Sequence, residues 1–295
     1  MRRVRRIGVL ALFGVLAVYP GRAAQACENT LGVSRTIEVD TTGGPWFGTP
    51  QGDPNFLAPG EVVLTFDDGP APRSTRAILA ALAAECTKAT FFVLGEMAAA
   101  HPDVIREMDA QGHTIGTHTW SHPNLRRLSD AKMKGQIEAA FTAAETGAGH
   151  PIAPFFRYPY LSHTPAGDTY LQSRNIAQFA IDIDSLDWRS RNAQSIVRRI
   201  AASLDRRGKG IILLHDIHPS TAAALPAVLA LLKSQGFRVV HLRPKAPAAT
   251  VAGYEVPAKE LRYEVPAKEH RYAAPARRNV VHAKPWLTGW KWPAW

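Results

Sequence analysis

The chain has 295 residues, of which 46% are hydrophobic, and it carries 35 Lys and Arg against 25 Asp and Glu. This apolar fraction is typical of a globular protein with a substantial core. The surplus positive charge lies at the two ends, because residues 1–26 hold five Arg and no acid, and residues 245–295 hold nine Lys or Arg against four Glu. The part between is neutral, so the charge does not argue for a nucleic-acid partner.

Residues 1–26 have the pattern of a secretory signal peptide. Four arginines near the start are followed by an apolar stretch from Ile7 to Val18 and by Ala24-Gln25-Ala26, an A-x-A cleavage site. The apolar stretch is short for a membrane anchor, and the residues before Cys27 fit a lipoprotein signal poorly. We expect a secreted or periplasmic protein with no transmembrane span after cleavage.

The chain has two cysteines, Cys27 and Cys86. In the oxidising compartment that follows export, one disulfide between them is the expected arrangement, and two unrelated thiols are the alternative. Neither cysteine lies in a CxxC or Cys-His pattern, so neither is assigned to catalysis.

Apolar runs alternate with helical stretches through the middle of the chain. We predict helices that include residues 74–85, 129–145 and 221–236, and strands at residues 61–68, 89–95, 113–118, 154–160, 176–184, 210–216 and 237–242. Strands that are almost wholly apolar indicate a parallel sheet covered on both faces, as in an α/β fold. Polar residues follow several different strands, which favours a (β/α) barrel because such ends converge on one mouth. We take residues 27–60 as an N-terminal extension and 61–243 as the catalytic domain.

The composition changes near residue 244. A nine-residue unit, YEVPAKELR at 254–262, recurs as YEVPAKEHR at 263–271 and more weakly as YAAPARRNV. A proline in each unit and the lack of apolar periodicity predict an extended or disordered tail over residues 244–295, which proteases would cut rapidly. Its basic charge could favour contact with an anionic cell envelope.

Two adjacent carboxylates, Asp67 and Asp68, follow the apolar strand at 61–68. Like charges that are partly desolvated raise the free energy of the fold, and a bound cation would offset that cost. His118 and His122 are four residues apart and would share one face of a helical turn, which makes half of a zinc site. Asp68 would complete a set of three ligands with an open position, typical of a catalytic metal.

A hydrolytic metal centre also needs a base and an acid. Asp67 is the candidate base and His215 the candidate acid, although a histidine satisfied in the core is equally consistent with the position of His215. Arg157 follows a strongly apolar run and should have a carboxylate partner. Asp67 would be a good partner, and a structural pair elsewhere is the alternative.

Five short motifs resemble those of the NodB-type polysaccharide deacetylases, carbohydrate esterase family four, over residues 60–243. In chain order they are TFDDGP (65–70), HTWSHP (118–123), RYPY (157–160), DSLDW (184–188) and LLHD (213–216). The resemblance implies a distorted (β/α) barrel of seven to eight strands and a metal, usually zinc and sometimes cobalt or manganese. It also implies Asp67 as base, His215 as acid, and the metal ligands Asp68, His118 and His122.

The same resemblance implies the supporting residues. Arg157 would orient the base, the backbone N–H of Tyr160 would bind the oxyanion, Asp187 would orient and tune His215, and Leu213 would line the acetyl pocket. Many members have Gly after the tyrosine of the third motif, where this chain has Leu161, so the wall of the groove should differ there. Trp188 could stack on a sugar ring, and a core position is the alternative.

The resemblance implies an exported deacetylase that removes N-acetyl groups from N-acetylglucosamine units of peptidoglycan or chitin-like oligomers. The alternative is an O-deacetylase of acetylated xylan or an exopolysaccharide. A third hypothesis is a glycan-binding protein on a decayed enzyme scaffold, but none of the expected ligands or acid–base residues is missing.

Overall fold

The protein is described by a computed structural model, which covers residues 27–53 and 55–249. The predicted signal peptide and the nine-residue repeats from residue 254 lie outside these residues. No helix in the described part of the chain has the length and apolar character needed to cross a membrane.

The prediction that the tail begins at residue 244 is wrong for its first residues. Pro244 pairs with Val39, the N–H of Ala248 donates to the carbonyl of Ile152, and Ala248 is buried in the core.

The described part contains a ten-stranded sheet whose strands pair in parallel. The strands are β1 (Arg35–Val39), β2 (Trp46–Phe47), β3 (Glu61–Asp67), β4 (Thr90–Val93), β5 (Thr114–Thr117), β6 (Phe155–Phe156), β7 (Ala177–Phe179), β8 (Ile183–Asp184), β9 (Gly210–His215) and β10 (Arg238–Pro244). The α-helices are α2 (Pro72–Ala84), α3 (Gly95–Ala100), α4 (Pro102–Ala110), α5 (Asp130–Ala148), α6 (Pro165–Ser173), α7 (Ala193–Arg207) and α8 (Pro219–Ser234).

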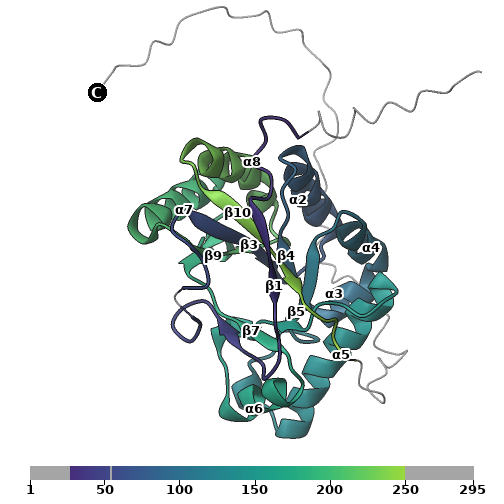
Figure 1. Ribbon diagram of the computed structural model, residues 1–295. Helices are drawn as coiled ribbons and strands as arrows, with labels where there is room; N and C mark the ends of the chain where they lie inside the picture. The colour runs from purple at the N-terminus through teal and green to yellow at the C-terminus, as the bar shows by residue number, and fades with distance from the viewer. Residues whose placement is uncertain (1–26, 54, 250–295) are drawn as a thin grey trace, which may run out of the picture. The chain divides into compact units, whose positions relative to one another are not determined.

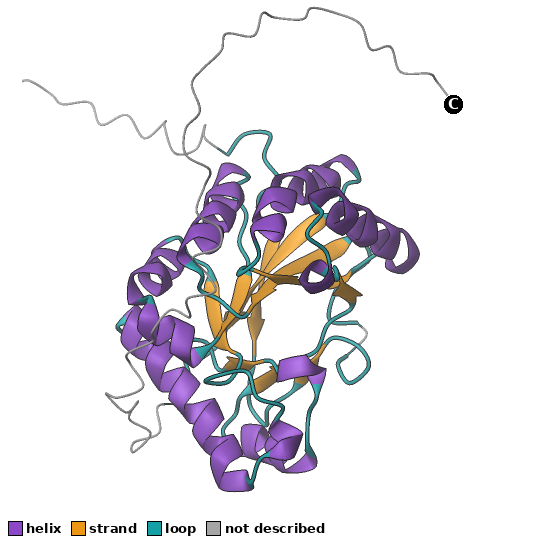
Figure 2. Ribbon diagram, turned by 180° about the vertical axis from the view of Figure 1, so that it is seen from behind, coloured by secondary structure: helices purple, strands orange, loops and turns teal. Residues whose placement is uncertain are grey.

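The sheet curls into a barrel around β3. On one side of β3 the order is β4, β5, β6 and β7, and on the other side β9 pairs with β3 and β8 with β9. Within the described part of the chain, β7 and β8 do not pair with each other. The ring of strands is completed there by the three residues that connect them. Helices surround the strands (Figures 1 and 2), so the predicted distorted (β/α) barrel is confirmed.

The alternation of side chains along β3 shows how the barrel is filled. Val62, Leu64 and Phe66 belong to the large cluster that includes residues of the surrounding helices, whereas Val63 belongs to a second cluster with residues of β4, β6, β7 and β9. Successive residues of a strand point to opposite faces. Asp67 therefore lies on the same face as Val63, at the carboxyl end of the barrel interior.

The base of the barrel is crossed by β10 and β1. The first two residues of β10 pair with the start of β3, and further along the strand His241 contacts Thr114 at the start of β5. β1 pairs with β10 from Arg35↔Val240 to Val39↔Pro244, and both strands lie across the opening of the barrel in Figure 1. Val39, Val240 and Leu242 join the interior cluster, so these strands close the bottom and leave the other end for chemistry.

Two of the predicted strands are altered in the structure. The run at 176–184 is divided into β7 and β8, and the run at 154–160 contributes only the two residues of β6. The residues taken as an N-terminal extension supply β1 and β2, which the sequence did not predict. β2 pairs with β7, and the segment after it reaches Asp182, whose carboxylate accepts hydrogen bonds from the N–H and hydroxyl of Thr49.

Candidate active site

The expected functional residues gather at the carboxyl ends of the strands. Asp67 is the last residue of β3, and Asp68 follows it in a left-handed conformation with φ 76°. The change of backbone conformation at Asp68 lets the two adjacent carboxylates face different partners, Arg157 for Asp67 and the histidines for Asp68. Gly69 comes next, where a Cβ atom would lie 2.1 Å from a carboxylate oxygen of Asp216, so glycine is required for this close approach.

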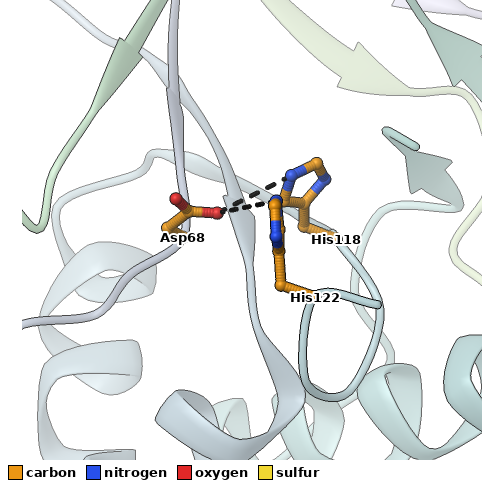
Figure 3. Close-up of side chains that lie close together, drawn as sticks. All are labelled: Asp68, His118 and His122. Carbon is orange, nitrogen blue, oxygen red and sulfur yellow. Dashed lines mark ion pairs between the residues drawn. The ribbon is translucent and has the colours of Figure 1, made fainter. Parts of the chain in front are cut away.

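Asp68, His118 and His122 converge on one point (Figure 3). Oδ1 of Asp68 lies 3.7 Å from Nε2 of His118 and 3.6 Å from Nε2 of His122, and one donor atom from each residue lies within 4.8 Å of the others. The predicted helical turn is wrong, because His118 follows β5 and His122 lies in a loop with φ 57°. The loop nevertheless brings the two rings together, with their centres 4.9 Å apart.

The donor set fits a divalent cation. Oδ1 of Asp68 is buried and has no hydrogen-bond partner among the described residues, a costly state that a cation would relieve. Nδ1–H of His118 donates to the carbonyl of Arg157 at 2.6 Å, which leaves Nε2 with a free lone pair. Burial lowers the pKa of both histidines, that of His118 far below its ordinary value, so both rings are neutral, as metal ligands must be.

Asp67 is held by a buried arginine. Its Oδ1 accepts a hydrogen bond of 2.6 Å from Nη1 of Arg157. Burial raises the pKa of Asp67, and the positive charges of Arg157 and His215 oppose that rise, which leaves the pKa at about 6. The carboxylate is thus mostly ionised at neutral pH, yet basic enough to accept a proton.

Arg157 itself is fixed on every side. Besides Asp67, its guanidinium donates to the hydroxyl of Thr65 and to the carbonyls of Phe179 and Ala180. Its Cζ lies 4.2 Å from the ring centre of Phe92, a cation–π contact. The expected arginine–carboxylate pair is present, and this network determines the position of Asp67.

His215 and Asp187 form a second pair beside the first. Nδ1–H of His215 donates to Oδ1 of Asp187 at 2.7 Å, and the backbone N–H of His215 donates to Oδ2 at 2.7 Å. The hydroxyl of Thr221 donates to the same Oδ2. Because Nδ1 is engaged, Nε2 is the nitrogen available for proton transfer.

The surroundings of His215 favour its protonated form. Burial alone would lower its pKa, but the hydrogen bond and charge of Asp187, together with the charges of Asp67 and Asp68, raise the pKa to about 9. At neutral pH the ring carries a proton, as a general acid must. Asp67 and His215 therefore have pKa values on opposite sides of neutrality, which suits a base and an acid in one site.

The remaining predicted residues lie around this centre. Tyr160 is 66% exposed, and its ring packs edge-on against His122 with centres 4.6 Å apart. Leu213 is buried on β9, two residues before His215. Trp188 is 55% exposed, which excludes the alternative of a core tryptophan.

Sequence reasoning missed three hydroxyls and one carboxyl that support the site. Thr65 and Thr221 bind Arg157 and Asp187, while Thr75 donates to Oδ2 of Asp216 at 2.6 Å. Asp216 is buried, which raises its pKa to about 7. A threonine in a strand or helix carries no sequence signal for such a role. Asp216, directly after His215, is among the polar residues that the sequence places at strand ends, but sequence reasoning assigned it no role.

Cys27 and Cys86 form the expected disulfide. It joins the segment before β1 to the residues that follow α2. Backbone hydrogen bonds at the same place, from Leu31 to the carboxylate of Glu85 and from Gly32 to its carbonyl, fix this segment to the barrel.

Comparison with known proteins agrees with this geometry. The sequence profile of a family described as "Polysaccharide deacetylase" matches residues 57–178. The peptidoglycan-N-acetylglucosamine deacetylase of Listeria monocytogenes is 34% identical over 186 residues, which are 61% of this chain and 38% of that protein. The chain thus spans little more than a third of that relative's length.

Two other proteins match over more of their length. A chitooligosaccharide deacetylase of Bradyrhizobium sp. is 31% identical over 192 residues, which cover 60% of this chain and 87% of that protein. The solved structure of a peptidoglycan deacetylase of Bdellovibrio bacteriovorus superposes with a TM-score of 0.68 at 31% identity, covering 78% of this chain and 64% of the other. With one relative matched over most of its length and the five motifs gathered at one end of the barrel, the chain belongs to the NodB-type polysaccharide deacetylase family.

Proposed function

We propose that the protein is a metal-dependent hydrolase that removes N-acetyl groups from N-acetylglucosamine units of a polysaccharide. The observation that carries this proposal is the arrangement of three groups at one mouth: a cluster of metal-type donors, an ionised carboxylate beside it, and a protonated histidine. Hydrolysis of an unactivated amide needs a polarised carbonyl, a base for the attacking water and an acid for the leaving amine.

Asp68, His118 and His122 would hold the cation, and their mixed oxygen and nitrogen donors suit zinc, with cobalt or manganese as other candidates. When bound, a cation of this kind supplies Lewis acidity, which polarises the acetamide carbonyl and lowers the pKa of water.

Asp67 would act as the base. It accepts a proton from the attacking water as the oxygen bonds to the acetyl carbon, and Arg157 holds the carboxylate at the required angle. The backbone N–H of Tyr160 would donate to the carbonyl oxygen as negative charge develops there. Leu213 would contact the acetyl methyl group, and Trp188 would stack on a sugar ring.

His215 would act as the acid. As the carbon–nitrogen bond breaks, Nε2 donates its proton to the departing nitrogen, and the products are acetate and a free glucosamine amine. Asp187 keeps the ring in the orientation and tautomer in which Nε2 carries that proton. After the reaction Asp67 is protonated and His215 is neutral. Asp67 then loses its proton to solvent and His215 takes one from solvent, which restores the starting state.

We further propose that the substrate is peptidoglycan or a chitin-like oligomer, met outside the cytoplasm. The relatives named above act on peptidoglycan or chitooligosaccharides, as their names state. A disulfide in a small α/β domain is typical of an oxidising compartment, and the leader at residues 1–26 has the composition of a signal peptide.

The test is acetate release by the mature protein from N-acetylglucosamine oligomers and from acetylated xylan, after chelation and after zinc is restored. We expect release from the oligomers only when metal is present. Asp67→Asn should lower the rate by about 10²–10⁴-fold, because it removes the base while keeping the shape of the side chain. Asp130→Asn, at an exposed position on α5, is the matched control and should keep full activity.

Each other outcome has a defined meaning. Release from xylan alone would make the protein an O-deacetylase. Metal binding without release from either substrate would contradict the proposal and favour a glycan-binding protein.

A further inference from the structure

The turn after the third motif has an unusual backbone. Tyr160 and Leu161 both have positive φ, 57° and 52°, and the N–H of Ser162 donates to the carbonyl of Pro159 at 3.0 Å. Positive φ at both central residues is what a type I′ turn requires, and such turns usually contain Asn-Gly or Gly-Gly. Glycine, which many family members have after this tyrosine, is therefore the residue that the backbone favours at position 161.

The fold does not favour leucine at position 161. A bulky side chain at positive φ is strained, and this one is also 42% exposed, one of three large apolar side chains that are exposed in the described part of the chain. The strain opposes folding, and an exposed side chain gains little from burial to offset it. A strained residue without compensating burial, beside the active site, indicates a role in function.

The turn at residues 159–162 lies beside the proposed metal site, which indicates a role in substrate binding. The ring of Tyr160 packs against the proposed metal ligand His122, and Leu161 is the next residue, about 3.8 Å further along the chain. Leu161 is therefore at the edge of the site and partly exposed, directly after the residue whose N–H is proposed to face the reacting carbonyl. Pyranose rings carry hydroxyls on their edges and C–H groups on their faces, so an apolar side chain at the rim can cover a sugar face.

We propose that Leu161 is a specificity-determining residue, which contacts the C–H face of the sugar next to the one that is deacetylated. This inference rests on the proposed function and adds the preference for a chain of sugars over a single unit. The proposal assigns Leu161 to the neighbouring sugar and not to the reacting atoms, so its loss should weaken binding of long substrates and leave the chemical step intact.

The experiment compares Leu161→Gly and Leu161→Asn with the parent chain. Both residues tolerate positive φ, so the melting temperature should not fall, while KM for the N-acetylglucosamine pentamer should rise about fivefold with kcat within twofold. KM for the dimer should change less. Leu161→Met keeps an apolar side chain and should keep the parent chain's KM for the pentamer. Asn29→Gly changes an exposed residue with φ 60° that is distant in sequence from Leu161, and it should change neither KM nor kcat.

Binding is also measured directly, by calorimetry with the pentamer in an Asp67→Asn background that cannot turn it over. Fivefold weaker binding of the pentamer by Leu161→Gly would support the role of Leu161, whether or not the parent chain releases acetate. In that case, failure of the parent chain to release acetate would contradict the proposed function and leave the role of Leu161 supported. Unchanged KM and Kd in both the Gly and Asn variants would overturn the role of Leu161 and leave the proposed function intact. No binding of any N-acetylglucosamine oligomer by the parent chain would overturn both.

Discussion

His215 shows how strongly one carboxylate can determine the chemistry of a neighbouring residue. Its ring is largely buried, and burial alone would make the imidazole neutral at pH 7. Asp187 reverses this, mainly through its hydrogen bond to Nδ1 and its charge, with a further contribution from the charges of Asp67 and Asp68, and Thr221 holds Asp187 in place. The acid that the proposed reaction needs thus depends on two residues that never touch the substrate.

Asp187→Asn should therefore lower the pKa of His215, since burial remains and the largest of the opposing effects is lost, while the charges of Asp67 and Asp68 still act on the ring. A smaller fraction of the ring would be protonated and its orientation would be lost, and we expect kcat/KM to fall about 10²–10³-fold. Because His215 works only while protonated, the alkaline limb of the pH–rate profile should move from near pH 9 to lower pH. The profile of acetate release against pH measures this.

Thr221→Val is the matched variant, because it removes one hydrogen bond to Asp187 and leaves the contact with His215. Its loss of rate should be several-fold and its alkaline limb should stay close to that of the parent chain. An Asp187→Asn variant with an unmoved alkaline limb would contradict the assignment of His215 as the acid.

The convergence of most of the site's side chains could be predicted from the sequence, because their types and spacing are typical of a metal site. Adjacent carboxylates after an apolar strand and two histidines four residues apart imply a cation. The backbone could not be predicted, since the positive φ values of Asp68 and His122 depend on contacts that form only in the folded chain. The histidines reach their common point through a loop, although their spacing suggested a helix.

Among the elements, the junction of β5 and β10 at the base of the barrel has two buried histidines. Nδ1 of His113 accepts a hydrogen bond from the N–H of Ala89, and Nε2 of His241 lies 2.9 Å from the hydroxyl of Thr114. Burial, followed by the charges of Lys88 and His241, lowers the pKa of His113 to about 3. Burial, followed by the charges of Arg243 and Lys88, lowers the pKa of His241 to about 4. Both are neutral in the folded protein.

These two histidines should make the fold sensitive to acid. Each has a folded pKa below its unfolded value of about 6.5, so the stability that it provides is complete above pH 6.5 and is lost as the pH falls towards 4 or 3. Between pH 6 and 4, each should lower the free energy of unfolding by about 1.4 kcal/mol per pH unit. Urea unfolding at several pH values gives this slope.

His113→Asn should reduce the slope by the contribution of one proton, whatever its effect on stability at pH 7. His150→Asn serves as control, because His150 is exposed and its pKa is raised by its hydrogen bond to Asp109, so it cannot produce a loss of stability in this direction. Equal slopes for the parent chain and His113→Asn would contradict the account.

The elements that the sequence failed to predict were those whose shape depends on other parts of the fold. The expected strand at 176–184 is interrupted because Arg157 takes the carbonyls of Phe179 and Ala180, at the point where β7 ends. The two-residue strand β2 is too short to give a periodic signal, and its pairing with β7 depends on the curvature of the completed barrel. The long apolar strands β3 and β9 gave the clearest sequence signal for a parallel α/β sheet.

Considered as a whole, the described chain is closed by contacts between its beginning and its later parts. The disulfide Cys27–Cys86 spans 59 residues, and it fixes the segment that leads into β1. Joining distant residues removes freedom chiefly from the unfolded chain, and a loop of this length corresponds to about 4 kcal/mol.

The double variant Cys27→Ser, Cys86→Ser should therefore lose about 4 kcal/mol of unfolding free energy, measured by urea titration, while keeping kcat under conditions where it is folded. A reducing agent should lower the stability of the parent chain to that of the variant and have no effect on the variant. Equal stability of the oxidised parent and the variant would show that the hydrogen bonds of Leu31 and Gly32 are enough to hold the segment.

The pairing of β1 with β10 also bears on the order in which the molecule can fold. Arg35 is among the first described residues to be synthesised, yet its ladder partner is Val240, so β1 remains without its strand partner until almost the whole domain has been made. Contacts of such long sequence separation form slowly, because most of the chain must be ordered first. We therefore expect the closing of the barrel base to be the late step of folding, with the strands between β3 and β9 assembled before it.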